Sequence, residues 1–204
     1  EKRPYVIENC SLTLRRGQRV AVIGPSGAGK STLVAMLLRV VEPETGELTI
    51  DGHSYNAFDI RDLRKNVAWL SQTTHIFADT IRNNLCLGGC YYPEEALWNA
   101  LSQAGLAHVV KDLPDGLDSW VGEGGKALSG GEGRRLVLAR ILLSDAPIII
   151  LDEPTTGLDA ETAESFFKTF EAATKDKTVL LVLHRLTGTE KLDLVWKLGD
   201  GHVK

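Results

Sequence analysis

The stretch GPSGAGKST, residues 24–32, decides the fold of this chain of 204 residues. It matches the pattern G-x-x-x-x-G-K-[ST]. The apolar run 19–23 before it is typical of a buried strand, and residues 31–39 after it carry apolar side chains at helical spacing. A strand, a glycine-rich loop and a helix in this order predict a loop that wraps phosphate groups.

Each part of this loop suits phosphate binding. Glycines allow backbone N–H groups to point inward, and the helix that begins at Lys30 aims the positive end of its dipole at the same anion. We expect Lys30 to reach the β- and γ-phosphates of a nucleotide and Ser31 to bind Mg²⁺. A plain glycine-rich turn is the alternative. The predicted nucleotide-binding set is Gly24, Pro25, Ser26, Gly27, Ala28, Gly29, Lys30, Ser31 and Thr32.

Two carboxylates follow a second apolar run. Residues 148–151 are Ile-Ile-Ile-Leu, and Asp152 and Glu153 come next. Ligands of open α/β sheets bind at the carboxyl edge of the strands, where an Asp of phosphate-loop enzymes holds Mg²⁺. We therefore expect Asp152 to hold the metal and Glu153 to act as general base or to position a water. A solvated strand end, with Asp-Glu-Pro as an ordinary turn, is the alternative.

Apolar runs alternate with helical patterns in most of the chain, which is typical of an α/β fold. Further strands are expected at 47–50, 67–71, 179–183 and 194–198, and a helix at 160–173. The middle differs, because it has helical patterns at 80–85, 93–104, 106–113 and 134–144. The sequence thus predicts a sheet core divided by a helical insertion of about 70 residues.

Composition narrows the class of protein. Hydrophobic residues make up 43% of the chain, which is enough for a sizeable core, and the net charge of −4 argues against nucleic acid as the main partner. No apolar segment approaches the roughly 20 residues of a spanning helix, and no cleavable signal peptide is visible. The three cysteines, Cys10, Cys86 and Cys90, lack ligand spacing, so reduced thiols in a cytosolic environment are expected.

Leu-Ser-Gly-Gly-Glu at 128–132 resembles the signature of ATP-binding cassette (ABC) proteins, usually Leu-Ser-Gly-Gly-Gln. Other motifs of that family stand in the family's order. Gln72 resembles the Q-loop residue, residues 156–159 the D-loop, and His184 the switch histidine. With these motifs the chain is identified as a member of the ABC nucleotide-binding domains over nearly its whole length.

This resemblance implies an α/β fold: a RecA-like P-loop NTPase core with an N-terminal antiparallel β part and an inserted α-helical subdomain. Residues 1–204 would form a single domain. Within it, the expected ATP-binding core is 1–72 and 145–204, and the expected helical subdomain, with Q-loop and signature, is 73–144.

The family also implies that two cassettes dock head to tail around two ATP molecules. Gln72 would contact Mg²⁺ and the attacking water, His184 would contact the γ-phosphate from its own side, and Asp159 would couple the two sites. The partner's ATP would be bound at the helix N-terminus formed by Ser129, Gly130 and Gly131. Without the family context, a lone His or Gln at a strand end is more often structural.

Smaller features resemble exporters. Residues 76–85 and 120–125 look like exporter sequence, in which Glu123 would meet the coupling helices of the transmembrane domains. Residues 184–188, with the signature, are similar to the CydC-type subunit of the heterodimeric cysteine and glutathione exporter, which supports assembly of cytochrome bd oxidase. The resemblance implies an ATPase with ATP and Mg²⁺ as ligands, placed on the cytoplasmic face of the plasma membrane.

Three positions depart from the family pattern. Glu132 replaces the signature Gln, and we expect it to cap or pair locally, for example with Arg134 or Arg135, because a carboxylate facing a triphosphate is unfavourable. Thr-Gly replaces the commoner Ser-Ala in the D-loop. Tyr5 lies only 12 residues before Gly17, too close for the aromatic that stacks on adenine, so a core or strand-edge position is expected for it.

Two other functions stay open. One is a regulatory cassette that holds ATP without turnover, although the presence of Glu153 and His184 favours catalysis. The other is a soluble ABC ATPase that acts on DNA or ribosomes, against which the exporter-like segments and the lack of a basic stripe argue.

Overall fold

The parallel strands predicted from the apolar runs form one sheet. The computed structural model describes residues 5–73, 75–87, 91–122, 127–156, 158, 160–199 and 202–203. Within these ranges, six strands are ordered β4-β5-β6-β1-β7-β8. The parallel strands are β1 (Arg19–Ile23), β4 (Val67–Leu70), β5 (Ile148–Asp152), β6 (Thr178–Leu183) and β7 (Leu194–Gly199), and β8 (His202–Val203) pairs antiparallel with β7.

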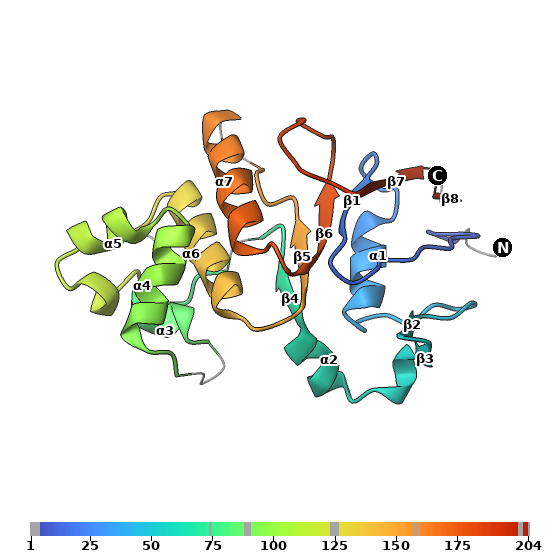
Figure 1. The fold of residues 1–204 in the computed structure, drawn as a ribbon, viewed down its shortest axis with the longest axis horizontal. Helices are drawn as coiled ribbons and strands as arrows, with labels where there is room; N and C mark the ends of the chain where they lie inside the picture. Colours follow the sequence, from blue (N-terminus) through green and yellow to red (C-terminus); the bar gives the residue numbers. More distant parts are fainter. Residues whose placement is uncertain are drawn as a thin grey trace.

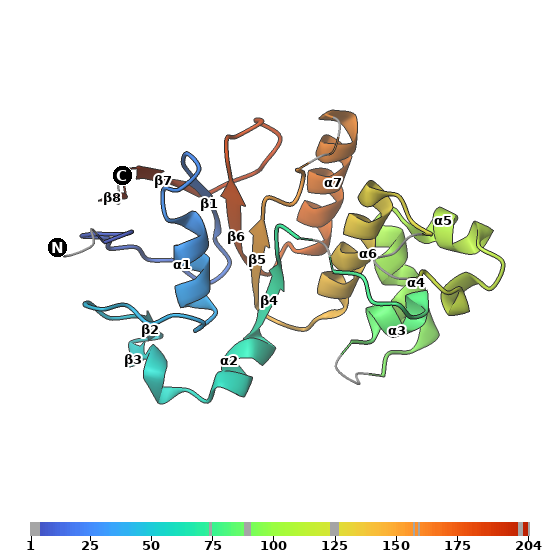
Figure 2. The same ribbon diagram turned by 180° about the vertical axis from the view of Figure 1, so that it is seen from behind.

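The central strands β1, β5 and β6 are buried on both faces, to which their successive side chains point alternately. Val20 and Val22 of β1 pack on the face covered by α1 (Lys30–Leu37). Ala21, between them, belongs to the core on the other face, which α6 (Gly130–Leu143) and α7 (Ala160–Ala173) cover. Figures 1 and 2 show α1 on one side of the sheet and α6 and α7 on the other.

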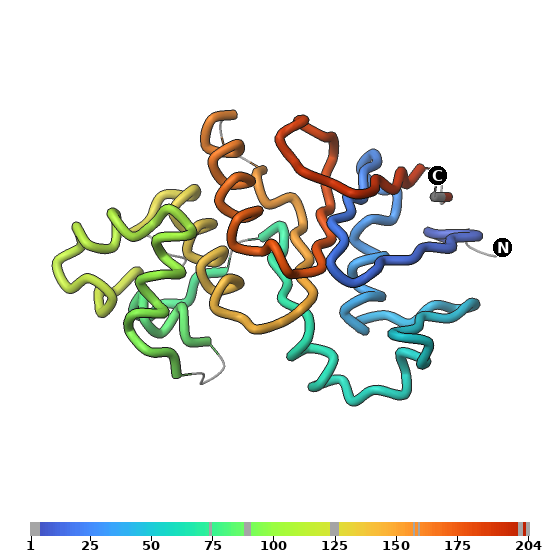
Figure 3. Tube along the Cα trace, in the orientation of Figure 1, coloured from blue at the N-terminus to red at the C-terminus, as the bar shows by residue number. Residues whose placement is uncertain are grey.

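The predicted helical insertion lies between β4 and β5. Its helices are α3 (Ile81–Leu85), α4 (Glu94–Gln103), α5 (Ala107–Asp112) and α6, with a 3₁₀ turn η2 (Gly116–Asp118) after α5. They gather at the end of the molecule away from both termini (Figure 3). Leu97 and Leu101 of α4 and Leu136 of α6 are fully buried between them. The subdomain boundaries at 72/73 and 144/145 stay a prediction.

The structure differs from the expected elements at three places. Helix α6 begins at Gly130, four residues before the predicted start at Arg134, because Ser129 caps it. A short helix α2 (Ile60–Asn66), which follows the 3₁₀ turn η1 (Tyr55–Ala57), was not predicted. The strand expected at 47–50 is shorter, since β2 covers only Thr49–Ile50; it pairs antiparallel with β3 (His53–Ser54) across the expected turn at 51–52.

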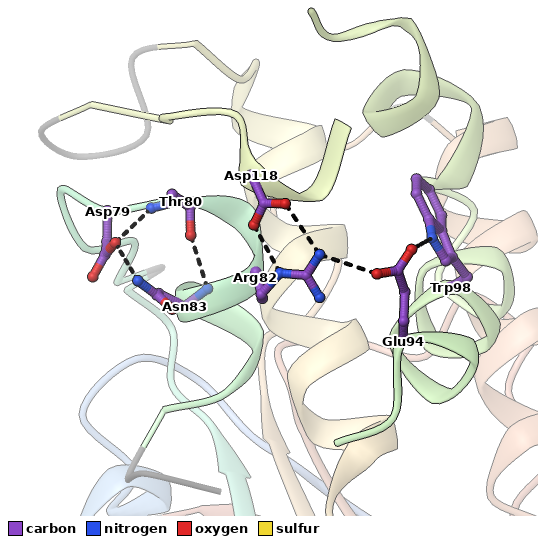
Figure 4. A network of polar contacts seen from close by, with 7 residues as sticks. All are labelled: Asp79, Thr80, Arg82, Asn83, Glu94, Trp98 and Asp118. Atoms are coloured by element: carbon purple, nitrogen blue, oxygen red, sulfur yellow. Dashed lines mark hydrogen bonds and ion pairs between the residues drawn. The ribbon is translucent and has the colours of Figure 1, made fainter. Parts of the chain in front are cut away.

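Two polar clusters hold α3 in place. Outside, Arg82 donates through Nε to Asp118 at 2.7 Å and through Nη2 to Glu94 at 3.2 Å, as Figure 4 shows. Inside, the fully buried Asn84 accepts from the Phe77 N–H at 2.9 Å through its side-chain oxygen. Arg140 of α6 donates to the Asn84 carbonyl at 2.7 Å, and burial lowers the pKa of Arg140 to about 10.

The two clusters give a prediction for stability. Asn84→Ala leaves the Phe77 N–H without its partner in a buried site, which costs about 2–3 kcal/mol of unfolding free energy. Arg82→Met removes ion pairs that water screens, so its loss should be clearly smaller. Urea denaturation of both variants measures the difference. Equal losses, or a larger one for Arg82→Met, would contradict this assignment.

Candidate functional site

The predicted phosphate loop, the two carboxylates after the second apolar run, Gln72 and His184 meet at the carboxyl edge of the sheet. Strands β1, β5 and β6 are parallel, with Ile23 opposite Leu183 and Asp152 opposite Val182. The segments that follow these strands therefore leave the sheet side by side. They are the loop 24–29 after β1, Glu153 after β5 and His184 after β6, with Gln72 two residues after the edge strand β4.

A cavity of about 220 Å³ lies at this edge. It is lined by Val6, Ser26, Gly27, Gly29, Lys30, Ser31, Thr32, Gln72, Asp152, Glu153 and His184. Apart from Val6, every one of these residues belongs to the predicted site. The loop residues Gly24, Pro25 and Ala28 do not line the cavity. A Cβ on Gly24 would lie 2.3 Å from the Leu198 carbonyl oxygen, so the loop can start here only with glycine.

The loop 24–29 is built to receive an anion. Gly27 and Gly29 have φ of +82° and +99°, in the left-handed region that favours glycine. Gly29 precedes α1 and offers no side-chain cap, so the first N–H groups of α1 have no side-chain acceptor there. Lys30 is buried, and its Nζ donates to the carbonyl oxygens of Gly24 at 2.7 Å and Pro25 at 3.0 Å. The ammonium group therefore lies inside the curve of the loop.

Glu153 is the polar centre of the site. Its side chain is almost completely buried, and its Oε1 lies 2.7 Å from His184 Nε2. Its Oε2 accepts from Gln72 Nε2 at 2.9 Å and from the Thr156 hydroxyl at 3.2 Å. The three residues with predicted catalytic roles are thus in direct contact. Sequence reasoning missed Thr156 as a partner of Glu153, although it lies in the D-loop motif.

Asp152 provides the oxygen chemistry that Mg²⁺ prefers. Burial raises the pKa of Asp152, the charge of Glu153 adds to that rise, and Lys30 and His184 oppose it. Ser31, which has a hydroxyl group, and Gln72, which has an amide group, line the same cavity. These groups fit Mg²⁺, which is bound through one or two carboxylates with phosphate oxygens and water. Within the described ranges, no group of three or more His, Cys, Asp and Glu side chains is arranged to hold a metal ion by itself.

The signature residues Ser129, Gly130 and Gly131 lie outside this cavity, at the N-terminus of α6. The Ser129 hydroxyl accepts from the Glu132 N–H at 3.3 Å, and Glu132 Oε2 accepts from the Ser129 N–H at 2.7 Å. This capping box confirms that Glu132 caps locally. In the part of the chain that the structure describes, neither Arg134 nor Arg135 forms an ion pair with Glu132.

The remaining residues singled out from the sequence, where the structure describes them, do not line the cavity. Asp159, Glu123 and Cys90 are outside the described residues, whereas Cys10 and Cys86 are free thiols.

The prediction that Tyr5 occupies a core or strand-edge position was wrong. Its side chain is half exposed, and residues 5–18 form no strand. Among the described helices, none has both the length and the apolarity needed to cross a membrane.

Comparison with known proteins identifies the family. A profile described as ABC transporter matches residues 7–156. The chain belongs to the ABC transporter family. It is 38% identical over 203 residues to the glutathione/L-cysteine transport system ATP-binding/permease protein CydC of Escherichia coli (strain K12), a match over 100% of this chain and 35% of that protein. It is 36% identical to the ATP-dependent lipid A-core flippase of Vibrio cholerae serotype O1, over 99% of this chain and 35% of that protein.

A solved structure of a bacterial Atm1-family ABC exporter with ATP bound agrees with the ABC fold, with a TM-score of 0.90 and 34% identity over 97% of this chain and 35% of that chain. The predicted P-loop NTPase fold and the ABC-type ATPase class of the domain are thereby confirmed. The chain spans about a third of the length of the curated relatives it matches. Since a glutathione/L-cysteine transport protein and a lipid A-core flippase match about equally well, these comparisons identify the ABC transporter family and no particular cargo.

The raised pKa of Asp152 predicts a pH-dependent stability difference. When the pKa of a carboxyl is higher in the folded state than in the unfolded state, the carboxyl lowers the free energy of unfolding at pH values above the folded-state pKa, because folding then disfavours its ionised form. Below the unfolded-state pKa the carboxyl is protonated in both states, and this loss of stability disappears. In EDTA, Asp152→Asn should therefore raise the Tm at pH 7.5 and lose this advantage towards pH 4. Differential scanning calorimetry at both pH values measures it. A lower Tm at pH 7.5 for the variant would contradict the assignment.

Proposed function

We propose that this chain is the ATP-binding and ATP-hydrolysing domain that powers an ABC exporter from the cytoplasmic face of the plasma membrane. One observation carries this proposal: the phosphate loop, Asp152, Glu153, Gln72 and His184 come from four strand ends and line one cavity. Each of these groups has chemistry that a bound and hydrolysed triphosphate requires.

Triphosphate binding would use the loop and the start of α1. Lys30 Nζ would exchange the carbonyl oxygens of Gly24 and Pro25 for phosphate oxygens, which are stronger acceptors because they are charged. The N–H groups around Gly27 and Gly29 would surround the same oxygens. Ser31, Asp152 and Gln72 would hold Mg²⁺, which when bound neutralises charge that builds up on the phosphates.

Hydrolysis would depend on Glu153. Its buried carboxylate can accept a proton from the attacking water or orient that water, which is a role worth about 10²–10⁴-fold in rate. Gln72 donates to Glu153 through its amide nitrogen, so its amide oxygen stays available for the metal. His184 would contact the γ-phosphate from the cassette's own side.

The proposed partner is a second cassette, docked head to tail. Ser129, Gly130 and Gly131 lie at a helix N-terminus outside the chain's own cavity, which fits a contact with the partner's ATP. Asp159 would couple the two sites. The coupling helices of the transmembrane domains are the other proposed partner, and nucleic acid is not one, since the net charge is −4.

We propose cysteine or glutathione as the cargo, in a heterodimeric exporter needed for cytochrome bd assembly. The support is the 38% identity to the CydC protein of Escherichia coli. The lipid A-core flippases provide the competing cargo at a similar identity. Uptake of labelled glutathione and labelled lipid A by inverted vesicles that contain the full transporter distinguishes the two. Transport of lipid A without glutathione would overturn this part of the proposal.

The role of Glu153 can be tested in the full transporter. Glu153→Gln should lower kcat for ATP about 100-fold or more and change KM little, because the amide cannot take a proton from water. Glu164→Gln, on an exposed position of α7, is the matched control and should retain wild-type turnover. Unchanged turnover in Glu153→Gln would show that this is a passive, ATP-holding cassette.

The need for two cassettes predicts a concentration dependence. In the chain alone, ATP hydrolysis should be slow, and the rate per molecule should rise with chain concentration, because each site is completed by a second copy. Steady-state phosphate release over a hundredfold range of chain concentration measures this. A rate strictly linear in concentration would mean that one chain hydrolyses ATP without a partner.

A further inference from the structure

Arg134 joins α6, the helix that begins within the signature, to the proposed base Glu153 and to its neighbour Gln72. It lies on α6, and its Nη1 donates to the Glu153 carbonyl oxygen at 2.8 Å, while its Nη2 donates to the Gln72 carbonyl oxygen at 3.2 Å. The side chains of Gln72 and Glu153 are themselves hydrogen-bonded at 2.9 Å. One guanidinium therefore closes a ring that links two loops and a helix.

The backbone of Glu153 needs such support. Its φ of +49° lies in the left-handed region, which is unfavourable for an L-residue and persists only where neighbours hold it. The Glu153 N–H donates to the Val182 carbonyl at 2.9 Å, and its carbonyl accepts from Arg134. Both sides of the strained residue are thus fixed, and the direction of its carboxylate follows from them.

The environment of Arg134 strengthens these two bonds. Burial lowers the pKa of Arg134, and the nearby Glu153 opposes that shift, so the guanidinium is partly withdrawn from water. Hydrogen bonds from a charged donor are stronger where the donor is partly shielded from water than where it is fully exposed. The planar fork of an arginine also supplies two donors in fixed geometry, which a lysine cannot do.

Arg135, the next residue along α6, has a different contact. Its Nη1 donates to the Gly105 carbonyl at 3.2 Å, in the turn between α4 and α5. It therefore fastens α6 within the helical insertion, whereas Arg134 fastens α6 to the edge of the sheet. The two neighbours on one helix form a natural pair for comparison.

We propose that Arg134 is a positioning residue for ATP hydrolysis. It fixes the backbone carbonyl groups of Gln72 and Glu153, and so couples the position of α6 to the direction in which the Glu153 carboxylate points. This inference rests on the proposed function. Arg134 does not line the cavity, so it acts on turnover through Glu153 and not on nucleotide binding. Movement of α6 when the partner's ATP binds at Ser129 would reach the base through this side chain.

The test uses the full transporter with Arg134→Gln, Arg134→Lys and the control Arg135→Gln. Displacement of a reacting group by about 1 Å costs up to 100-fold in rate, so kcat of Arg134→Gln should fall about 10–100-fold while KM for ATP stays within about threefold. Arg134→Lys keeps the charge and one bond, and should recover part of kcat. Arg135→Gln should retain kcat within about twofold.

Thermal unfolding with and without Mg·ATP accompanies the kinetics. The increase in Tm caused by Mg·ATP should be the same in wild type and in both Arg134 variants, because binding is intact. If Arg134→Gln does not fold, Arg134→Lys tests the inference instead. A kcat equal to wild type in Arg134→Lys would show that the two donors of the guanidinium group are not needed.

Two results would overturn the inference: an unchanged kcat in Arg134→Gln, whether or not KM rises, or equal losses of kcat in Arg134→Gln and Arg135→Gln. Each of these presupposes a wild-type transporter whose turnover depends on Glu153. A wild-type transporter without such turnover would instead overturn the proposed function, and this inference with it.

Discussion

The parallel pairing of β1, β5 and β6 is the constraint on which the rest of the site depends. Parallel strands end at the same edge, and the observed register sets Ile23 beside Leu183 and Asp152 beside Val182. Apolar side chains on both faces hold this register, because a slip of one residue would turn each strand's side chains to the wrong core. The loop after β1, the carboxylates at the end of β5 and the histidine after β6 are therefore brought to the same edge.

Within that frame, the polar groups of the site are satisfied by one another. Glu153 contacts Gln72 and His184, and Lys30 donates to carbonyl oxygens of its own loop. Such bonds avoid the cost of buried polar groups without partners. A triphosphate with Mg²⁺ would compete for the same donors and acceptors. Nucleotide binding and the release of Glu153 from its neighbours are thus expected to be linked, and Arg134 keeps the backbone of Glu153 in place through that exchange.

Much of this could be predicted from the sequence, because the decisive signals are local. Apolar runs locate the strands that carry the site, and the motif of the loop at 24–32 by itself predicts that the loop binds phosphate groups. The start of α6 was predicted too late, since the glycines at 130, 131 and 133 are typical of a loop, yet the capping box of Ser129 and Glu132 begins a helix there. The contacts of Arg134 could not be predicted, because they join α6 to residues far away in the sequence.

The most direct test of this account is a crystal structure of the chain with Mg²⁺ and a non-hydrolysable ATP analogue. We predict Lys30 Nζ on phosphate oxygens, and Mg²⁺ about 2.1 Å from the Ser31 hydroxyl oxygen and from the Gln72 amide oxygen. The bond from Arg134 to the Glu153 carbonyl should persist. A bound analogue that leaves Lys30 on the carbonyl oxygens of Gly24 and Pro25, or that lies away from the carboxyl edge of the sheet, would contradict the account.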